Sequence, residues 1–196
     1  MLPIADKVFI ALLTVLAGFH IKNSRFSEVE YVRSNIDNRS YMVRSLSNKQ
    51  NAANLLAKVN RRLILLVEHM RKNIDEFEEE DVKRLVGNFN PDNTSEGTDK
   101  ANYTSYSVNK GEKIIFCLRS RDGKDKLIDL NTLMYVAIHE LGHLMTEEIG
   151  HPPPFWKNFR ILLEEAIDLG LYKAVNYAKK PVKYCGMKIQ STILND

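Results

Sequence analysis

The sequence predicts an α+β domain that is mainly helical, with a small β-sheet beside one very apolar helix and a hydrophobic helix ahead of both. Three observations support this fold class: two long segments with apolar residues at three- and four-residue spacing, short alternating runs between them, and an uncharged stretch near the start. A chain of 196 residues can bury one proper core but is too short for two large domains. We therefore expect a hydrophobic segment, residues 1–22, and one globular domain, residues 23–196.

The composition argues against several classes of protein. With 44% hydrophobic and 27% charged residues, the chain is globular rather than disordered. The formal charge of +3 is mild and no dense basic block is interleaved with aromatic residues, so there is no clear nucleic-acid site. Cys117 and Cys185 form no CxxC pair, which suits a reducing compartment and leaves one disulfide between them open. Nothing indicates an oligomeric state.

Residues 8–21, VFIALLTVLAGFHI, carry no Asp, Glu, Lys or Arg. As a helix at about 1.5 Å per residue they would span about 21 Å, which is short of the roughly 30 Å hydrocarbon core of a bilayer. Three interpretations stay open: a short membrane anchor that recruits residues 2–5, a cleaved signal peptide, and a buried helix. We favour the anchor, with the domain on the cytosolic side of the membrane, and keep secretion after signal cleavage as the alternative.

The first half of the domain is predicted to contain a short extended piece and two helices. The extended piece, SEVEYVRS, falls within the polar residues 22–46. Residues 48–73 repeat apolar side chains along one helical face and form a long amphipathic helix, on which His69 is a surface or boundary residue. The acidic residues 75–81 start a further short helix through Val86, because carboxylates are favourable at a helix N-terminus.

A loop and a small sheet are predicted next. Residues 87–101, GNFNPDNTSEGTDKA, form a loop by composition. Two short β-like runs follow, residues 104–108 and 113–119, joined by a turn at residues 109–111. Cys117 lies in the second run and is interpreted as a buried thiol, because neither a helix N-terminus nor a histidine adjoins it to activate it. A last strand is expected within KKPVKYCGMKI, near the end of the chain.

The next helix is capped by Asp129 or Asn131 and is apolar almost all round, so we expect it to be buried. His139, Glu140 and His143 are costly on such a helix, because each buried polar group needs a partner or a metal. The spacing of i and i+4 puts both imidazoles on one face, where their nitrogens can reach one cation. Glu140 is turned by about 100° from His139, close enough to touch a metal-bound water without ligating the metal. This is the HExxH arrangement of zinc hydrolases.

Two downstream residues are candidates for a third zinc ligand. His151 follows Gly150, which can end the helix in a left-handed turn and let the chain double back past the metal. Glu164 lies on a second amphipathic helix, residues 154–169, with Asp168 one turn further on. We favour His151, because the following PPPFW would hold the loop beside the first helix.

The segment HELGHLMTEEIGHPPPFW resembles the SprT-like and WLM (Wss1-like) metallopeptidases of the zincin class. In those enzymes a histidine ahead of a phenylalanine-containing helix completes a three-histidine zinc site, which implies His139, His143 and His151 here. Glu164 with Asp168 instead resembles the glutamate-ligand, thermolysin-like zincins. The resemblance covers about residues 104–170 and leaves residues 22–100 unmatched. It implies that the strand pair ahead of the helix binds an extended substrate; the relatives' DNA-repair role is not carried over.

The resemblance and the motif together predict a zinc (Zn²⁺) metallopeptidase with Glu140 as general base and a protein or peptide as substrate. The alternative is a membrane-tethered scaffold that keeps zinc for stability alone, with Cys185, Glu164 or Asp168 as a fourth ligand. Glu140 favours hydrolysis, because a structural site has no need of that carboxylate. The remaining candidates lie near this site in our interpretation: Tyr184 as an oxyanion donor and Met187 beneath the zinc, although core packing is favoured for both, and Trp156 and Tyr135 as pocket residues.

Overall fold

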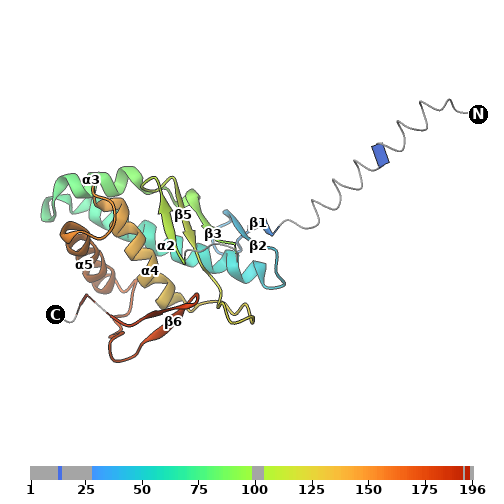
Figure 1. Cartoon of the computed structure of the whole chain (residues 1–196). Helices are drawn as coiled ribbons and strands as arrows, with labels where there is room; N and C mark the ends of the chain where they lie inside the picture. Colours follow the sequence, from blue (N-terminus) through green and yellow to red (C-terminus); the bar gives the residue numbers. More distant parts are fainter. Residues whose placement is uncertain (1–12, 15–27, 99–103, 192, 195–196) are drawn as a thin grey trace, which may run out of the picture.

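The computed structural model describes residues 13–14, 28–98, 104–191 and 193–194. Apart from Leu13 and Thr14, which are helical, these residues form an α+β fold with four α-helices, a mixed five-stranded sheet and a separate two-stranded hairpin (Figure 1). The helices are α2 (Lys49–Lys72), α3 (Glu79–Asn88), α4 (Leu130–Met145) and α5 (Pro153–Asp168). The strands are β1 (Val29–Arg33), β2 (Ser40–Arg44), β3 (Thr94–Glu96), β4 (Tyr106–Val108), β5 (Lys113–Phe116), β6 (Val182–Tyr184) and β7 (Met187–Ile189).

The order of the larger sheet is β1-β2-β3-β5-β4, which places β4 at one edge. The outer pairs, β1 with β2 and β4 with β5, are antiparallel, whereas β3 is parallel to both of its neighbours. Helix α2 packs against β1, β2 and β3 and against the other three helices, so its apolar face is the centre of the core. Helix α4 contacts α2, α3, α5 and the edge strand β4. The α+β class and the small sheet are therefore confirmed, but the sheet is larger than predicted.

Three strands, β2, β3 and β6, were not predicted from the sequence; the single strand expected within KKPVKYCGMKI is a hairpin of two strands, β6 and β7. The predicted loop at residues 87–101 in fact contains the short helix η2 (Pro91–Asn93) and β3. The three residues of β3 are polar and nevertheless buried, because distant side chains bind them: Asn60 lies 3.0 Å from Thr94 Oγ1, and the Arg119 guanidinium lies 2.6 Å from Glu96 Oε1. A strand made of buried polar residues lacks the alternation of apolar and polar residues by which strands are predicted from sequence.

The N-terminus of α4 decides between the two predicted caps. The Asp129 carboxylate accepts a hydrogen bond from the Thr132 N–H at 2.9 Å, which satisfies one of the open donors of the first turn. Asn131 instead exchanges two hydrogen bonds of 2.9 Å with the backbone of Lys173. The cap is therefore Asp129, and Asn131 holds the segment that follows α5 against α4.

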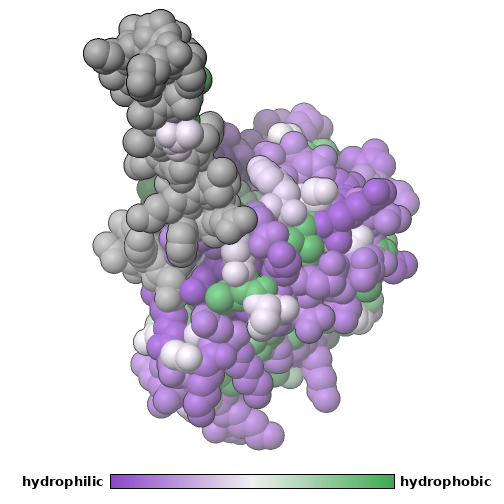
Figure 2. Space-filling model, turned by 90° about the vertical axis from the view of Figure 1, so that its right-hand side faces the viewer, coloured by the Kyte–Doolittle hydropathy of each residue, from purple (hydrophilic) through white to green (hydrophobic). Residues whose placement is uncertain are grey.

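The predicted hydrophobic helix and membrane anchor, residues 8–21, lie outside the described residues except for Leu13 and Thr14. Among the helices that the structure describes, none combines the length and the apolar character needed to span a membrane. The face drawn in Figure 2 is largely hydrophilic, with small hydrophobic patches between hydrophilic residues.

Cys117 and Cys185 form a disulfide, with their Cα atoms 6.2 Å apart. This corrects the interpretation of Cys117 as a free buried thiol and removes Cys185 as a zinc ligand. The bond ties the residue after β5 to the turn between β6 and β7, where Cys185 and Gly186 both have positive φ angles of 48° and 86°. Two such residues are what a tight antiparallel hairpin requires. The disulfide therefore attaches the hairpin to the five-stranded sheet.

Replacing both cysteines, Cys117→Ser with Cys185→Ser, is expected to lower the free energy of unfolding by about 2–4 kcal/mol, because the bond closes a loop of 68 residues in the unfolded chain. Urea denaturation followed by tryptophan fluorescence measures the change. Wild-type protein in excess dithiothreitol is the control and should unfold like the double variant. An unchanged midpoint in the double variant would contradict the stabilising role of the disulfide.

Candidate active site

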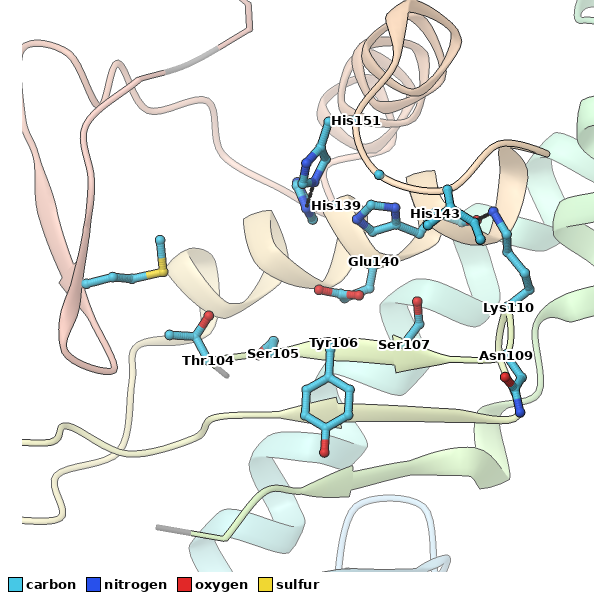
Figure 3. Close-up of a pocket in the computed structure, with 13 residues that line it drawn as sticks. Thr104, Ser105, Tyr106, Ser107, Asn109, Lys110, His139, Glu140, His143 and His151 are labelled. Atoms are coloured by element: carbon cyan, nitrogen blue, oxygen red, sulfur yellow. Dashed lines mark hydrogen bonds between the residues drawn. The ribbon is translucent and has the colours of Figure 1, made fainter. Parts of the chain in front are cut away.

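Helix α4 carries His139, Glu140 and His143 into a cleft beside the edge strand β4. The rings of His139 and His143 lie one helical turn apart, with their centroids separated by 5.0 Å. Both rings are half-buried, and Glu140 is only 4% exposed. Figure 3 shows the two imidazoles above β4, with the Glu140 side chain pointing into the space between the helix and the strand.

His151 joins this pair after the chain has turned back on itself. Helix α4 ends at Met145, and Gly150 has a φ angle of 86°, which a residue with a side chain rarely adopts. His151 Nε2 then lies 3.1 Å from His139 Nε2, and one nitrogen from each of the three rings lies within 4.8 Å of the other two. Zinc–nitrogen bonds of about 2.0–2.1 Å in a tetrahedron place two nitrogens about 3.3 Å apart. The cluster therefore has the dimensions and donor chemistry of a three-histidine zinc site.

The other ligand candidates from the sequence do not join the cluster. Glu164 and Asp168 are exposed on α5, and among the described residues the group that could hold a metal consists of the three histidines. His69 does not belong to the cluster either. Its Nε2 atom lies 2.7 Å from Glu165 Oε2 on α5. The structure thus brings His151 and not Glu164 to the HExxH pair, while the ligand role of all three histidines stays a prediction.

The ring of Phe155 packs against all three imidazoles. It stacks on His143 at a centroid distance of 4.4 Å and lies edge-on to His139 at 4.9 Å and to His151 at 4.6 Å. This position is available because residue 142 is glycine: a Cβ atom there would lie 3.0 Å from the Phe155 ring. The proline run lets α5 start at Pro153, two residues after His151. The loop is therefore held beside α4 by the aromatic residue that follows the prolines.

Burial shifts the ionisation of the two helical histidines in the direction that metal binding needs. Burial, aided by the neighbouring imidazoles, lowers the pKa of His139 to about 3 and the pKa of His143 to about 4. Both rings are consequently neutral at pH 7. A neutral imidazole offers a nitrogen lone pair to a cation, so no proton has to be displaced before a metal binds.

Glu140 has the opposite shift for the same reason. Burial raises the pKa of its carboxyl to about 7, although hydrogen bonds from the backbone and side chain of Ser107 act against this. Its Oε2 atom has no hydrogen-bond partner among the described residues. A buried carboxylate oxygen without a partner is costly unless something absent from the protein chain satisfies it. Water beside a zinc ion would supply that partner, so the carboxylate and the histidine cluster both fit a zinc site.

Lys110, predicted from the sequence only as part of a turn, holds the end of α4. Its Nζ atom lies 2.7 Å from the Thr146 carbonyl oxygen, 2.8 Å from that of Glu148 and 3.3 Å from that of His143. A cation at this position binds carbonyls that have no helical partner and opposes the negative end of the helix dipole. Because Lys110 belongs to the turn between β4 and β5, it links the edge strand to the ligand helix.

The cleft itself is a hollow of about 570 Å³ between β4 and α4. Ser105 and Ser107 line one side, the histidines and Glu140 the other, and Lys110 one end (Figure 3). Met187 also lines the hollow and is 49% exposed, so the expectation that it packs in the core is wrong.

Two other residues singled out in the sequence lie beside this hollow. Tyr184 is buried as expected, with its hydroxyl 2.6 Å from Ser105 Oγ. Trp156 is 44% exposed, and its ring centroid lies 5.5 Å from that of His151. Tyr184 therefore packs in the core, whereas Trp156 stands at the surface next to the histidine cluster.

Comparisons with known proteins assign the chain to a family. The family model described as "WLM domain" matches residues 35–191, which confirms the resemblance inferred from the sequence and extends it into residues 22–100, where none was found. An uncharacterized protein of Acanthamoeba polyphaga mimivirus is 37% identical over 191 residues, covering 94% of this chain and 95% of its own length. An uncharacterized protein of Invertebrate iridescent virus 6 is 36% identical over 69 residues, which are 35% of this chain and 38% of its own.

Among solved structures, the crystal structure of Wss1 from Saccharomyces cerevisiae is similar at 22% identity and a TM-score of 0.48. The similarity covers 65% of this chain and 88% of that one.

The purified full chain is expected to hold one zinc ion, and His139→Ala or His143→Ala should remove most of it, because each change deletes one of the clustered nitrogens. His151→Ala should also reduce zinc retention, whereas the matched variant Glu164→Ala on the exposed face of α5 should not. Metal analysis after dialysis against a weak chelator measures retention. Full zinc content in a His139→Ala, His143→Ala double variant would refute the site, and stronger loss from Glu164→Ala than from His151→Ala would refute this ligand set.

Lys110→Met is expected to destabilise the protein by about 1–2 kcal/mol, because it leaves carbonyls at the end of α4 without their cation. Thermal melting measures the loss. Lys113→Met removes the same charge from an exposed position three residues away and is the control, for which little change is expected. Equal melting temperatures for the two variants would show that the helix end does not depend on Lys110.

Proposed function

Because this chain belongs to the WLM domain family, we propose that it is a zinc-dependent metallopeptidase that hydrolyses peptide bonds with Glu140 as general base. One observation carries the proposal. Three imidazole nitrogens converge, and the carboxylate next to one of them on α4 has a buried oxygen with no partner among the described residues. A metal site with a base of this kind beside it is suited to activating water.

His139, His143 and His151 would hold the zinc ion through three nitrogens. When bound, zinc supplies a Lewis acid that polarises the scissile carbonyl and lowers the pKa of water at the site. Three protein ligands leave a position for substrate and water, as in catalytic rather than structural zinc sites.

Glu140 would move the proton. Its Oε2 atom takes the proton from the attacking water and returns it to the nitrogen of the leaving amine. In the metal-free site, burial raises the pKa of this carboxyl to about 7, so burial acts against the stabilising effect that a nearby cation would have on the carboxylate. Ser107 donates hydrogen bonds to the same carboxylate and orients it from the side of β4.

The substrate would be a protein or peptide segment in extended conformation. Strand β4 lies at the edge of the sheet and forms one wall of the cleft, so a substrate strand can pair alongside it in front of Glu140. This follows the expectation that the strand pair ahead of α4 binds the substrate.

The alternative, a scaffold that keeps zinc for stability, would need a fourth protein ligand. Cys185 is in the disulfide, and both Glu164 and Asp168 are exposed outside the histidine cluster. None of the three candidates is placed for that role, which favours hydrolysis.

The placement of the enzyme in the cell is a proposal from the sequence alone. Residues 1–22 would anchor the protein to a membrane through residues 8–21, with the peptidase domain of residues 23–196 on the cytosolic side. The residues that match the WLM domain, 35–191, lie inside this predicted domain. A signal peptide and secretion are the alternative.

Glu140→Gln is expected to reduce peptide cleavage about 10²–10⁴-fold, because the amide cannot accept the proton of the water. Zinc content should stay at the wild-type level, since Glu140 is not assigned as a ligand. Cleavage of casein, assayed beside metal analysis and with a chelator control, measures the effect. Glu164→Gln makes the same chemical change on the exposed face of α5 and should retain full activity.

Two outcomes would contradict the proposed function. Equal cleavage by wild type and Glu140→Gln would exclude Glu140 as the base. Zinc bound to both proteins with cleavage by neither, over a broad set of protein substrates, would favour the scaffold.

A further inference from the structure

A second hollow, of about 370 Å³, opens beside the cleft, and we call it the side pocket. It lies between α4, α5 and the β6–β7 hairpin, and His139 and Glu140 line both the cleft and the side pocket. The side pocket therefore adjoins the predicted zinc ligand His139 and the proposed base Glu140. Its walls are mainly apolar or aromatic: Tyr135, Val136, Trp156, Phe159, Tyr184 and Ile189.

The chemistry of these walls selects a kind of side chain. Tyr135 and Phe159 contact each other edge-to-face at 5.3 Å, and they present ring surfaces with Trp156 at the mouth. Among the described residues that line the side pocket, Glu140 is the only carboxylate, and Lys188 adds a positive charge. A cationic side chain would thus meet no free counter-charge, whereas a large apolar side chain would cover the aromatic walls.

The direction of β4 tells which substrate residue reaches the side pocket. Thr104 and Ser105, just before β4, line both the main cleft and the side pocket, whereas Asn109 and Lys110, beyond the end of β4, line only the main cleft. A peptide that pairs antiparallel to β4, as β5 does on the other side, runs from Lys110 toward Ser105. The substrate residues on the carboxyl side of the cleaved bond then lie toward the side pocket. Successive side chains of an extended peptide point to opposite sides of the peptide, so neighbouring residues do not both point into the side pocket.

We propose that the side pocket binds the side chain of the residue immediately after the cleaved bond and prefers an aromatic or large aliphatic one. This rests on the proposed function and adds the substrate class. Val136 on α4 and Ile189 on β7 set the width of the side pocket, so they determine specificity without taking part in the reaction.

Cleavage of short peptides tests the preference and the direction together. The probes are acetyl-Ala-Ala-Ala-X-Ala-Ala-amide peptides with Phe, Leu, Ala, Lys or Glu at X. We expect cleavage before X, with kcat/KM for Phe or Leu about tenfold to a hundredfold above Ala, and Lys the poorest. Val136→Phe fills the side pocket and should abolish the preference for Phe over Ala. Leu65→Phe adds the same ring at an exposed position on α2, outside both hollows, and should leave the preference unchanged.

Binding can be measured without cleavage, because Trp156 is the only tryptophan of the chain and stands at the mouth of the side pocket. In the zinc-loaded Glu140→Gln protein, the Phe peptide should change Trp156 emission and bind about tenfold more tightly than the Ala peptide. The added Val136→Phe substitution should remove this difference. A melting curve that matches wild type shows that each variant is folded.

The outcomes separate the inference from the proposed function. Cleavage after X, or equal cleavage of the Phe and Ala peptides, would overturn the side-pocket assignment and leave the peptidase intact. If no peptide or protein is cleaved, the proposed peptidase function is refuted, and the Trp156 titration still tests the side pocket. Equal binding of the Phe and Ala peptides would overturn the side-pocket assignment. Selective binding of the Phe peptide would support it.

Discussion

The geometry of the cleft depends on how closely α5 approaches α4 at Gly142. With a hydrogen atom as its side chain, this residue lets the Phe155 ring lie under His139 and His143. The ring in turn limits where the preceding residues can go, and His151 is placed beside the other two imidazoles. A methyl group at position 142 would push α5 outward, because packed aromatic rings cannot be compressed. Three histidines from a helix and a loop are thus brought together by a contact that involves none of their polar atoms.

Burial beside this contact acts on the ionisable groups in opposite directions. A low-dielectric environment disfavours charge, so it keeps the imidazoles of His139 and His143 neutral and pushes the pKa of Glu140 upward. Burial is the largest cause for all three groups, and the neighbouring imidazoles add to it for the two histidines, so one helix carries neutral imidazoles beside a carboxyl with a raised pKa. Ser107 limits the upward shift by donating hydrogen bonds to the carboxylate, which keeps part of it ionised at pH 7.

Much of this arrangement could be predicted from sequence because the signals are local. The period of α4 and the i, i+4 histidines define a helix and its chemistry within a few residues, and Gly150 with the prolines indicates the turn that returns His151. The remaining features depend on residues far apart along the chain. Thr94 and Glu96 can be buried in β3 only because Asn60 and Arg119 bind them, 34 and 23 positions away. The disulfide and the side pocket likewise appear only when the C-terminal hairpin is placed beside α4.

Lys110 has a mechanical consequence. It joins the turn at the end of β4 to the carbonyl groups at the end of α4, one of which belongs to His143. At the opposite end of β4, Ser105 is bonded to Tyr184 of the hairpin that the disulfide holds. The edge strand is therefore clamped at both ends to the elements that surround the histidines. Because both ends of the strand are attached, a change in the position of β4 relative to the histidines requires the contacts of Lys110 or of Ser105 to break.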